Sequence, residues 1–198
     1  MRKDLIRGSL VVIVFTVLLG VVYPLVMTGI SQVVLHDKAE GSLIRKDGKV
    51  VGSHLLATAG TPGAGHSRRY FQARPSVTGY SGTVTYFANR GPNQRSTFYL
   101  TRQHLRAFLA REQPYDPGLT ADKVPVDAVT FSASGVDPHI SQANAAIQAH
   151  RVAAVRKLPI GRVRDLIDAN TAGRGLGVFG EPGVNVTDLN LALDQESR

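Results

Sequence analysis

Cysteine is absent from this chain of 198 residues. Without cysteine the chain has no disulfide framework, no thiolate zinc cluster and no thiol nucleophile. The absence is compatible with an oxidising exterior, although it does not by itself place the protein there.

The signatures of common catalytic sites are missing as well. The sequence has no G-x-S-x-G elbow, no H-E-x-x-H motif and no G-x-x-x-x-G-K-[ST] phosphate loop. The glycine-rich stretch at residues 60–65 lacks the lysine of a phosphate loop, so we interpret it as a flexible loop. The histidines lack the spacing of metal ligands, and we interpret all six as surface residues: His36, His54, His66, His104, His139 and His150. We therefore expect neither a catalytic residue nor a metal site.

Three polar residues in the stretch SASGVD could be mistaken for the nucleophile and acid of a hydrolase. They are Ser132, Ser134 and Asp137. A hydrolase also needs a base within hydrogen-bond reach and donors for an oxyanion. The simpler interpretation is a small-residue turn followed by a helix cap.

Carboxylates are absent between Asp47 and Glu112, whereas nine basic residues fall in that interval. This stretch, residues 48–111, is either a site for an anionic partner, such as lipid headgroups or an acidic protein face, or a solvated surface. We favour the solvated surface. No nucleic-acid partner is expected. The basic residues are Lys49, Arg68, Arg69, Arg74, Arg90, Arg95, Arg102, Arg106 and Arg111.

The sequence does contain one long uncharged run near its N-terminus. Residues 8–35 contain no Asp, Glu, Lys, Arg or His, and as a helix they would extend about 42 Å against a hydrocarbon core of roughly 30 Å. A cleaved signal peptide would have a shorter apolar region and a small-x-small cleavage site, and a buried soluble helix would tolerate Pro24 poorly. We therefore predict a permanent transmembrane anchor.

The charges that flank this run predict its orientation. Arg2, Lys3 and Arg7 precede it, whereas His36–Glu40 is nearly balanced in charge. The positive-inside rule then puts residues 1–7 in the cytoplasm, residues 8–35 in the membrane and residues 36–198 outside the cell. The protein is expected in the plasma or inner membrane as a single-pass chain.

Residues 36–198 are enough for one domain, and their patterns predict a mixed α+β fold. We expect a hairpin at residues 43–55 around Asp47-Gly48, and a helix at residues 96–112. A β-branched strand should follow at residues 124–131, with a turn at residues 132–135.

The remaining elements are also predicted from caps and periodicity. Asp137 and Pro138 should start a helix that runs to about Lys157, and another helix should occupy residues 159–170. The final stretch VNVTDLNLAL is interpreted as one strand with a bulge at Thr187-Asp188.

Several motifs then follow one another in a recognisable order. They are the anchor with Tyr23-Pro24, GSLI (41–44), YFQARPS (70–76), VPVDAVTFSASGVDPHIS (124–141), QAHRVA (148–153) and GRGLGVFGEPGVNVTDLNLALD (173–194). Together they resemble the C subunit of the bacterial Kdp potassium-transporting P-type ATPase, over most of the chain. The stretch SGTVTYFANRGPNQRS (81–96) and His150 depart from the family pattern.

The resemblance implies an accessory subunit of a potassium pump. Its partners would be a potassium-channel-like A subunit, a P-type B subunit that hydrolyses ATP and a small F subunit, with membrane lipid around the anchor. The sequence agrees that this chain is not the motor, because it has one span and no Asp-Lys-Thr-Gly-Thr phosphorylation loop. No firmly bound cofactor is expected.

The family is also described as a catalytic chaperone that raises the ATP affinity of the hydrolytic subunit. On that description Ser132, Ser134, Gly135 and Asp137 would contact nucleotide, with ATP reached through the complex. The expected topology puts these residues outside the cell, where ATP is scarce, so we favour a role in assembly and stabilisation.

Tyr23 and Pro24 are the residues that we expect to touch a partner. Proline frees a carbonyl that hydrocarbon cannot satisfy, which favours a helix–helix contact over a lipid-facing kink. Two other functions stay open from the residues alone. One is a membrane-anchored extracytoplasmic enzyme, and the other is an anion-binding sensor module that uses residues 48–111.

Overall fold

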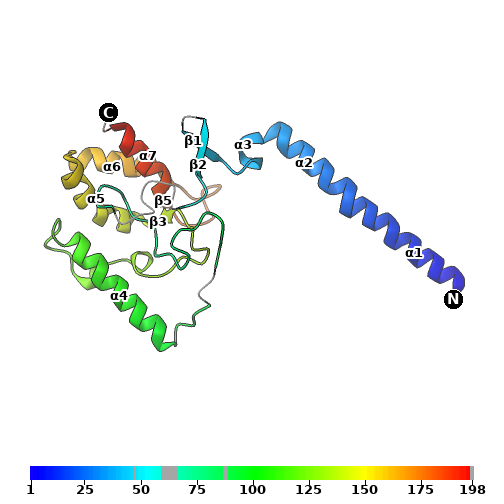
Figure 1. Cartoon of the computed structure of the whole chain (residues 1–198), viewed down its shortest axis with the longest axis horizontal. Helices are drawn as coiled ribbons and strands as arrows, with labels where there is room; N and C mark the ends of the chain where they lie inside the picture. Colours follow the sequence, from blue (N-terminus) through cyan, green and yellow to red (C-terminus); the bar gives the residue numbers. More distant parts are fainter. Residues whose placement is uncertain (47, 59–66, 87–88, 197–198) are drawn as a thin grey trace. The chain divides into compact units, whose positions relative to one another are not determined.

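The structure is a computed structural model that describes residues 1–46, 48–58, 67–86 and 89–196. They divide into two compact units, Met1–Leu43 and Ile44–Arg198. A long apolar helix and a domain of helices and small sheets confirm the predicted α+β class (Figure 1). The stretch at residues 60–65 and the neighbouring His66 lie outside the described residues.

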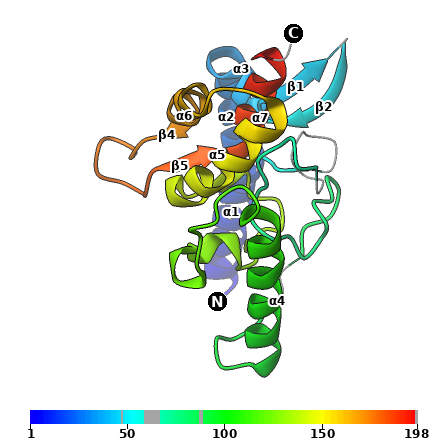
Figure 2. The ribbon, with the colours of Figure 1, turned by 90° about the vertical axis from the view of Figure 1, so that its left-hand side faces the viewer.

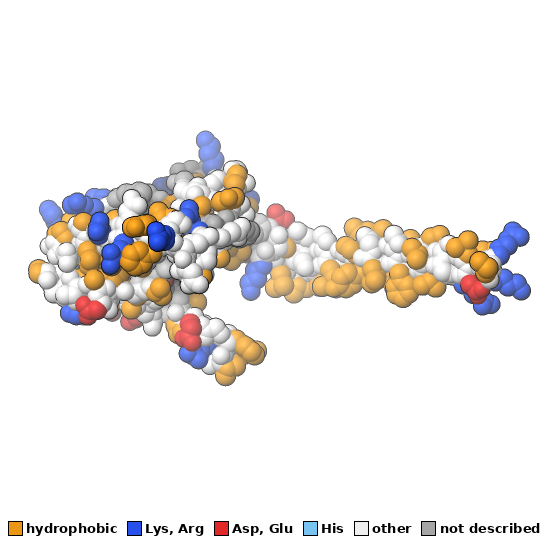
Figure 3. All heavy atoms as spheres, turned by 90° about the horizontal axis from the view of Figure 1, so that it is seen from below, with side chains coloured by type: hydrophobic (Ala, Val, Ile, Leu, Met, Phe, Trp, Pro, Cys, Tyr) orange, Lys and Arg blue, Asp and Glu red, His pale blue; other side chains and the backbone are white. Residues whose placement is uncertain are grey.

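The first unit is dominated by one continuous helix, Arg2–Val34, of 33 residues with a mean hydropathy of 2.8. It comprises α1 (Arg2–Val17), a π-helical turn η1 (Leu18–Val22) and α2 (Tyr23–Val34), and the short α3 (His36–Ala39) follows. None of the side chains in this helix is buried within the chain. Hydrophobic groups cover its surface, and basic groups gather at its N-terminal end (Figure 3).

The π-helical turn stands immediately before Pro24. Proline has no backbone N–H, and its ring clashes with the carbonyl four residues earlier in an ordinary α-helix. Here the backbone N–H of Tyr23 donates to the carbonyl of Leu18, five residues back, so the turn is widened where the ring needs space. The helix therefore continues through Pro24.

The second unit begins with the predicted hairpin, formed by β1 (Leu43–Lys46) and β2 (Lys49–Ser53). A second, antiparallel sheet has the order β3-β5-β4, with β3 at His139–Ile140, β4 at Thr171–Ala172 and β5 at Gly183–Asn185. His139 lies opposite Asn185, and Thr171 lies opposite Val184. Figure 2 shows the loop between β4 and β5 projecting from this sheet.

Two helices, α5 (Gln142–Arg156) and α7 (Val186–Glu196), contact β5 of this sheet, and α6 (Ile160–Ala169) packs on both of them. They bury the main hydrophobic core, whose largest fully buried apolar side chains include Phe71, Leu189 and Leu193. The predicted helices that end near Lys157 and occupy residues 159–170 are confirmed. Lys157 adopts a left-handed conformation at the C-terminal end of α5.

The predicted helix at residues 96–112 is confirmed as α4 (Arg95–Glu112). Its Phe108 is buried in a smaller core with Leu119, Ala128 and Val129. The rest of α4 extends away from the helices around the sheet (Figure 2).

Residues 67–86 have almost no regular structure, so side chains from α5 and α7 satisfy the backbone there. The amide of Gln148 accepts from the N–H of Gln72 at 2.7 Å and donates to the carbonyl of Gln72 at 3.0 Å. Asn190 makes the same two-way contact with Phe71, at 2.9 Å in both directions. These amides replace a neighbouring strand, which explains how an irregular segment can be buried.

The predicted strand at residues 124–131 is wrong. Two 3₁₀ turns stand there and just before it, η2 (Ala121–Lys123) and η3 (Val126–Ala128). The Asp127 carboxylate accepts from the N–H and the hydroxyl of Ser141, both at 2.8 Å, and from the amide of Asn144 at 3.0 Å. The 3₁₀ turn η3 positions the Asp127 carboxylate to accept these hydrogen bonds at the start of α5. This tertiary contact outweighs the strand propensity of the β-branched residues in the segment.

The predicted cap at Asp137 is also wrong. The N-cap of α5 is Ser141, whose hydroxyl accepts from the N–H of Asn144 at 3.1 Å. His139 and Ile140 are extended because they pair with β5, so the helix cannot start at Pro138. His139 therefore lies in β3, whereas His150 lies in α5.

The predicted final strand is wrong beyond its first residues. β5 ends at Asn185 and α7 begins at Val186. The Asn185 side chain accepts from the N–H of Asp188 at 3.2 Å, as a helix cap does. The apparent change of parity at Thr187-Asp188 is therefore the start of a helix, in which Val186, Leu189 and Leu193 share the buried side.

Candidate functional site

The loop at residues 132–137 is built on the segment that contains Arg74, Ser76 and Thr78. The N–H of Ser132 donates to the carbonyl of Pro75 at 3.0 Å. The carbonyl of Gly135 accepts from the hydroxyls of Ser76 at 2.5 Å and Thr78 at 3.3 Å. The predicted small-residue turn is thus present and is held by side chains about 60 positions earlier.

Gly135 is required by its conformation and by its neighbours. Its φ is +75°, and a Cβ placed there would lie 2.9 Å from the hydroxyl oxygen of Thr78. A larger residue would have to strain the backbone and displace Thr78. The glycine is therefore explained by the turn.

Asp137 is held by contacts on two sides. Its carboxylate accepts from the N–H of His139 at 2.9 Å and lies 3.5 Å from the guanidinium of Arg74. Arg74 also donates to the carbonyl of Phe131 at 3.0 Å. Burial alone would raise the pKa of Asp137, but the hydrogen bonds from His139 and the charge of Arg74 lower it below its ordinary value.

Asp137→Asn should lower the free energy of unfolding at pH 7 by about 1 kcal/mol or less, because it removes a partly exposed ion pair. The folded-state pKa lies below the ordinary 3.8, so the carboxylate stabilises the fold above that pH and ceases to do so as the pH falls through the folded value. Melting temperatures at pH 7 and pH 3 measure this, with Asp168→Asn on α6 as the exposed control. A difference that grows on acidification would contradict the assignment.

A cavity of about 390 Å³ lies beside this loop. Ser132 and Ala133 line it on one side, and Thr97, Leu100 and Thr101 of α4 on another; Arg90 supplies a positive charge. Ser132 is only 4% exposed, and its hydroxyl has no hydrogen-bond partner among the described residues. A bound polar or anionic group could satisfy that hydroxyl.

The four residues tied to nucleotide by resemblance do not share this cavity. Ser132 lines it, whereas Ser134, Gly135 and Asp137 are absent from its lining. Ser134 instead accepts from the N–H of Val136 at 3.2 Å, within its own turn. Of the four residues predicted to contact nucleotide, only Ser132 lies at the cavity. The other three hold the turn and its surroundings in place.

A second cavity, of about 420 Å³, is also lined by Phe131. His104 and Arg111 of α4 line it together with Tyr80. The Nδ1 atom of His104 lies 2.9 Å from the carbonyl of Val129, and its ring packs edge-on against Phe131. His104 is thus part of the packing under α4.

The other described histidines have varied settings. His36, His54 and His139 are exposed, as predicted, and His150 is partly buried. His54 pairs with Asp188. Within residues 1–46, 48–58, 67–86 and 89–196, no cluster of three or more His, Asp or Glu could hold a metal ion.

A buried ion pair is the main polar feature that sequence reasoning missed. Arg151 and Glu112 are 0% and 1% exposed, and the Nε atom of Arg151 donates to the Glu112 carboxylate at 2.9 Å. Arg151 also donates to the carbonyls of Arg68 and Tyr70, at 2.5 and 2.9 Å. The only sequence signal was that Glu112 is the first carboxylate after the basic stretch.

Tyr23 and Pro24, the predicted partner contacts, belong to the first unit. Both lie in α2, directly after the π-helical turn, and Tyr23 is 58% exposed within the chain. Their surface is therefore available to lipid or to another helix.

Comparison with known proteins identifies relatives along nearly the whole chain. A family model described as KdpC, K+-transporting ATPase, c chain, matches residues 5–195. A protein of Mycobacterium tuberculosis is 41% identical over 197 residues, covering 98% of this chain and all of the relative. One from Methylococcus capsulatus is 44% identical over 189 residues, covering 93% and 94%. Both relatives are named potassium-transporting ATPase KdpC subunit. The chain therefore belongs to the KdpC family, the c chain of K+-transporting ATPase.

Proposed function

We propose that this chain is the accessory subunit that stabilises an ATP-driven, high-affinity potassium uptake complex through its membrane helix. Membership of the KdpC family makes it a non-catalytic subunit of the potassium-transporting ATPase. The observation that carries the proposal is the apolar helix Arg2–Val34, which buries none of its side chains within the chain. Its partners are the A, B and F subunits of the Kdp complex.

The proline region is the part of this helix best suited to a protein contact. A backbone carbonyl without its usual N–H partner costs several kcal/mol in hydrocarbon, and neighbouring helices can satisfy it. The π-helical turn at Leu18–Val22 also makes the surface of the helix irregular at this point. We therefore assign the face around Tyr23 and Pro24 to a helix of another subunit.

Pro24→Leu is expected to reduce co-purification of the larger subunits with the tagged chain while leaving membrane insertion intact. Leucine restores a regular helix, so the surface fitted to the partner is lost. Quantitative detergent pull-downs measure the recovery, and Val14→Leu, an apolar exchange in α1, is the matched control. Full recovery of the complex with Pro24→Leu would show that this position faces lipid.

The orientation of the chain follows from Arg2, Lys3 and Arg7 at the start of the helix. Within this proposal the second unit lies outside the cell, beside the extracytoplasmic face of the partners. The projecting loop between β4 and β5 would then offer them an apolar tip, because Leu176, Val178 and Phe179 are 92%, 69% and 68% exposed.

Alkaline phosphatase fused after Arg198 should be active, because the enzyme folds only outside the cytoplasm. The same enzyme fused after Arg7 should be inactive. Activity per amount of expressed fusion is the measurement. An expressed but inactive fusion at Arg198 would reverse the orientation.

The same result bears on nucleotide contact, which is the second candidate function. Ser132 lines the 390 Å³ cavity and its buried hydroxyl has no partner among the described residues, which favours a polar ligand beside it. ATP could reach that cavity only if the second unit were cytoplasmic. An active fusion therefore removes the nucleotide hypothesis, and an inactive one would revive it.

A further inference from the structure

The exposed side of α4 carries arginines and aromatic rings together. At 100° per residue, five residues fall within an arc of about 100°. They are Arg95, Phe98, Tyr99, Arg102 and Arg106, which we call the α4 face, and all five are exposed. Phe98 and Tyr99 are 53% and 67% exposed, although large aromatic rings are normally among the most buried side chains of a domain.

These side chains are organised with one another. The guanidinium of Arg102 lies 4.4 Å from the centre of the Phe98 ring, and the rings of Phe98 and Tyr99 meet edge to face at 6.1 Å. No ion pair within the described part of the chain involves the three arginines of the face. Glu112, the single carboxylate of α4, is buried and pairs with Arg111 and Arg151. The positive charge of the face is therefore uncompensated.

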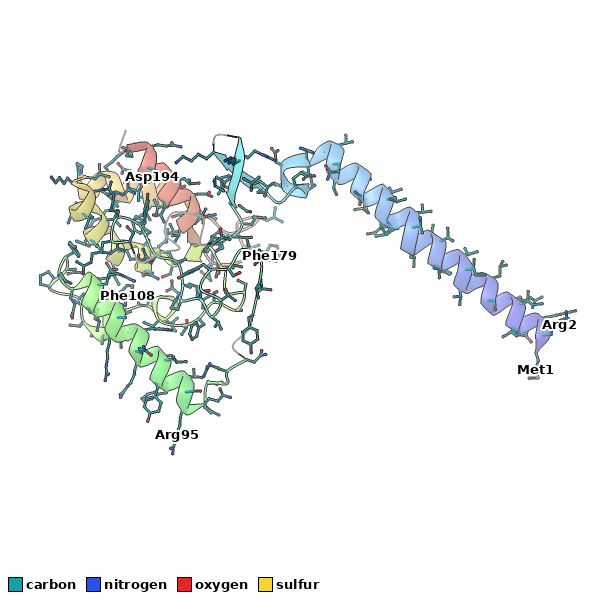
Figure 4. The ribbon with its side chains drawn as sticks, viewed as in Figure 1. Met1, Arg2, Arg95, Phe108, Phe179 and Asp194 are labelled. Carbon is teal, nitrogen blue, oxygen red and sulfur yellow. The ribbon has the colours of Figure 1, made fainter. Side chains whose placement is uncertain are left out.

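The position of the face leaves it accessible. Phe108 anchors one end of α4 in the smaller core, while Arg95 lies at the opposite end and points away from the rest of the unit (Figure 4). Thr97, Leu100 and Thr101, on the inner side of the helix, line the 390 Å³ cavity. Viewed from the side toward which Arg95 points, the unit shows blue basic groups next to orange hydrophobic ones (Figure 3).

We propose that the α4 face docks on the surface of an anionic lipid bilayer. Arginines complement the charge of anionic headgroups, and aromatic rings are favoured at the boundary between headgroups and acyl chains. Protein interfaces are also rich in arginine and aromatic residues, so the choice of lipid over a protein surface rests on the apolar helix of the same chain. The apolar helix of the same chain tethers the domain to a membrane, so the lipid is always near.

The test uses the full chain in lipid nanodiscs. Because the sequence has no cysteine, Gln103→Cys gives a single site, at the edge of the face, for an environment-sensitive fluorophore. In discs of phosphatidylcholine with phosphatidylglycerol the emission should shift to shorter wavelength and be quenched by spin-labelled lipid. Discs of phosphatidylcholine alone should give neither effect, and 1 M salt should reverse both, since it shortens the Debye length to about 3 Å.

Charge-removing variants decide whether the face itself is responsible. The triple variant R95Q/R102Q/R106Q should lower the ratio of docked to undocked domain on the order of a hundredfold, because each basic residue at such a surface is worth about a factor of five. The matched control R69Q/K157Q/R164Q removes three exposed charges elsewhere and should keep the docking. Circular dichroism confirms that both variants are folded.

Three outcomes would overturn the proposal. They are equal emission in neutral and anionic discs, equal loss of docking in the two triple variants, and, in discs that also contain the A, B and F subunits, burial of the label that requires those subunits irrespective of lipid charge. The last outcome would make the α4 face a protein interface. The test does not depend on the orientation of the chain, because both leaflets of a disc have the same composition.

Discussion

Arg151→Met is expected to lower the free energy of unfolding of the Ile44–Arg198 unit by about 3–5 kcal/mol. The substitution removes the fully buried partner of the Glu112 carboxylate, which is 1% exposed, and leaves it paired with the partly exposed Arg111 at 2.7 Å. It also removes the donors to the carbonyls of Arg68 and Tyr70, which lie outside the strands of the described residues. This loss is a large fraction of the free energy of unfolding of a domain, which is about 5–15 kcal/mol.

Urea unfolding of the full chain in detergent measures this loss. Glu112→Leu combined with Arg151→Met should recover part of it, because an apolar pair of similar volume leaves no buried charge. Arg162→Met, which breaks the exposed pair with Glu196, is the control and should change the midpoint little. If Arg151→Met were as stable as the parent, the ion pair would not hold the segment in place.

The features that could be predicted from the sequence are those that local patterns determine. The long apolar helix follows from an uncharged run, the hairpin from Asp47-Gly48, and α4 and α6 from the spacing of their apolar residues. The prediction of one strand over residues 184–193 was wrong because β5 is only three residues long and α7 follows it directly. The apolar positions 186, 189 and 193 fit a helix, but the preceding alternation suggested a strand.

The parts that could not be predicted depend on partners that are distant in sequence. Asp127 binds the start of α5, and Glu112 meets Arg151 39 positions later. The turn at residues 132–135 was predictable from its small residues, whereas the pairing of Asp137 with Arg74 was not, because nothing local marks a contact 63 positions away. The cavity beside Ser132 needs α4 and therefore also escaped prediction.

Loss of this chain should abolish high-affinity, ATP-driven potassium uptake. The chain belongs to the KdpC family, and its relatives are named as subunits of the potassium-transporting ATPase. It supplies no phosphorylation loop of its own. Its contribution to transport must therefore come from contacts with the other subunits, which we assign to the helix Arg2–Val34 and to the second unit. A chain confined to residues 1–43 should restore assembly in part, through the helix alone.

Potassium uptake by proteoliposomes, prepared with and without this chain, tests the account most directly. The purified chain alone should hydrolyse no ATP, and vesicles that contain only the other subunits should take up no potassium at low external concentration. Adding the chain during assembly should restore both uptake and potassium-dependent ATP hydrolysis. Hydrolysis by the isolated chain, or full uptake in its absence, would contradict the account.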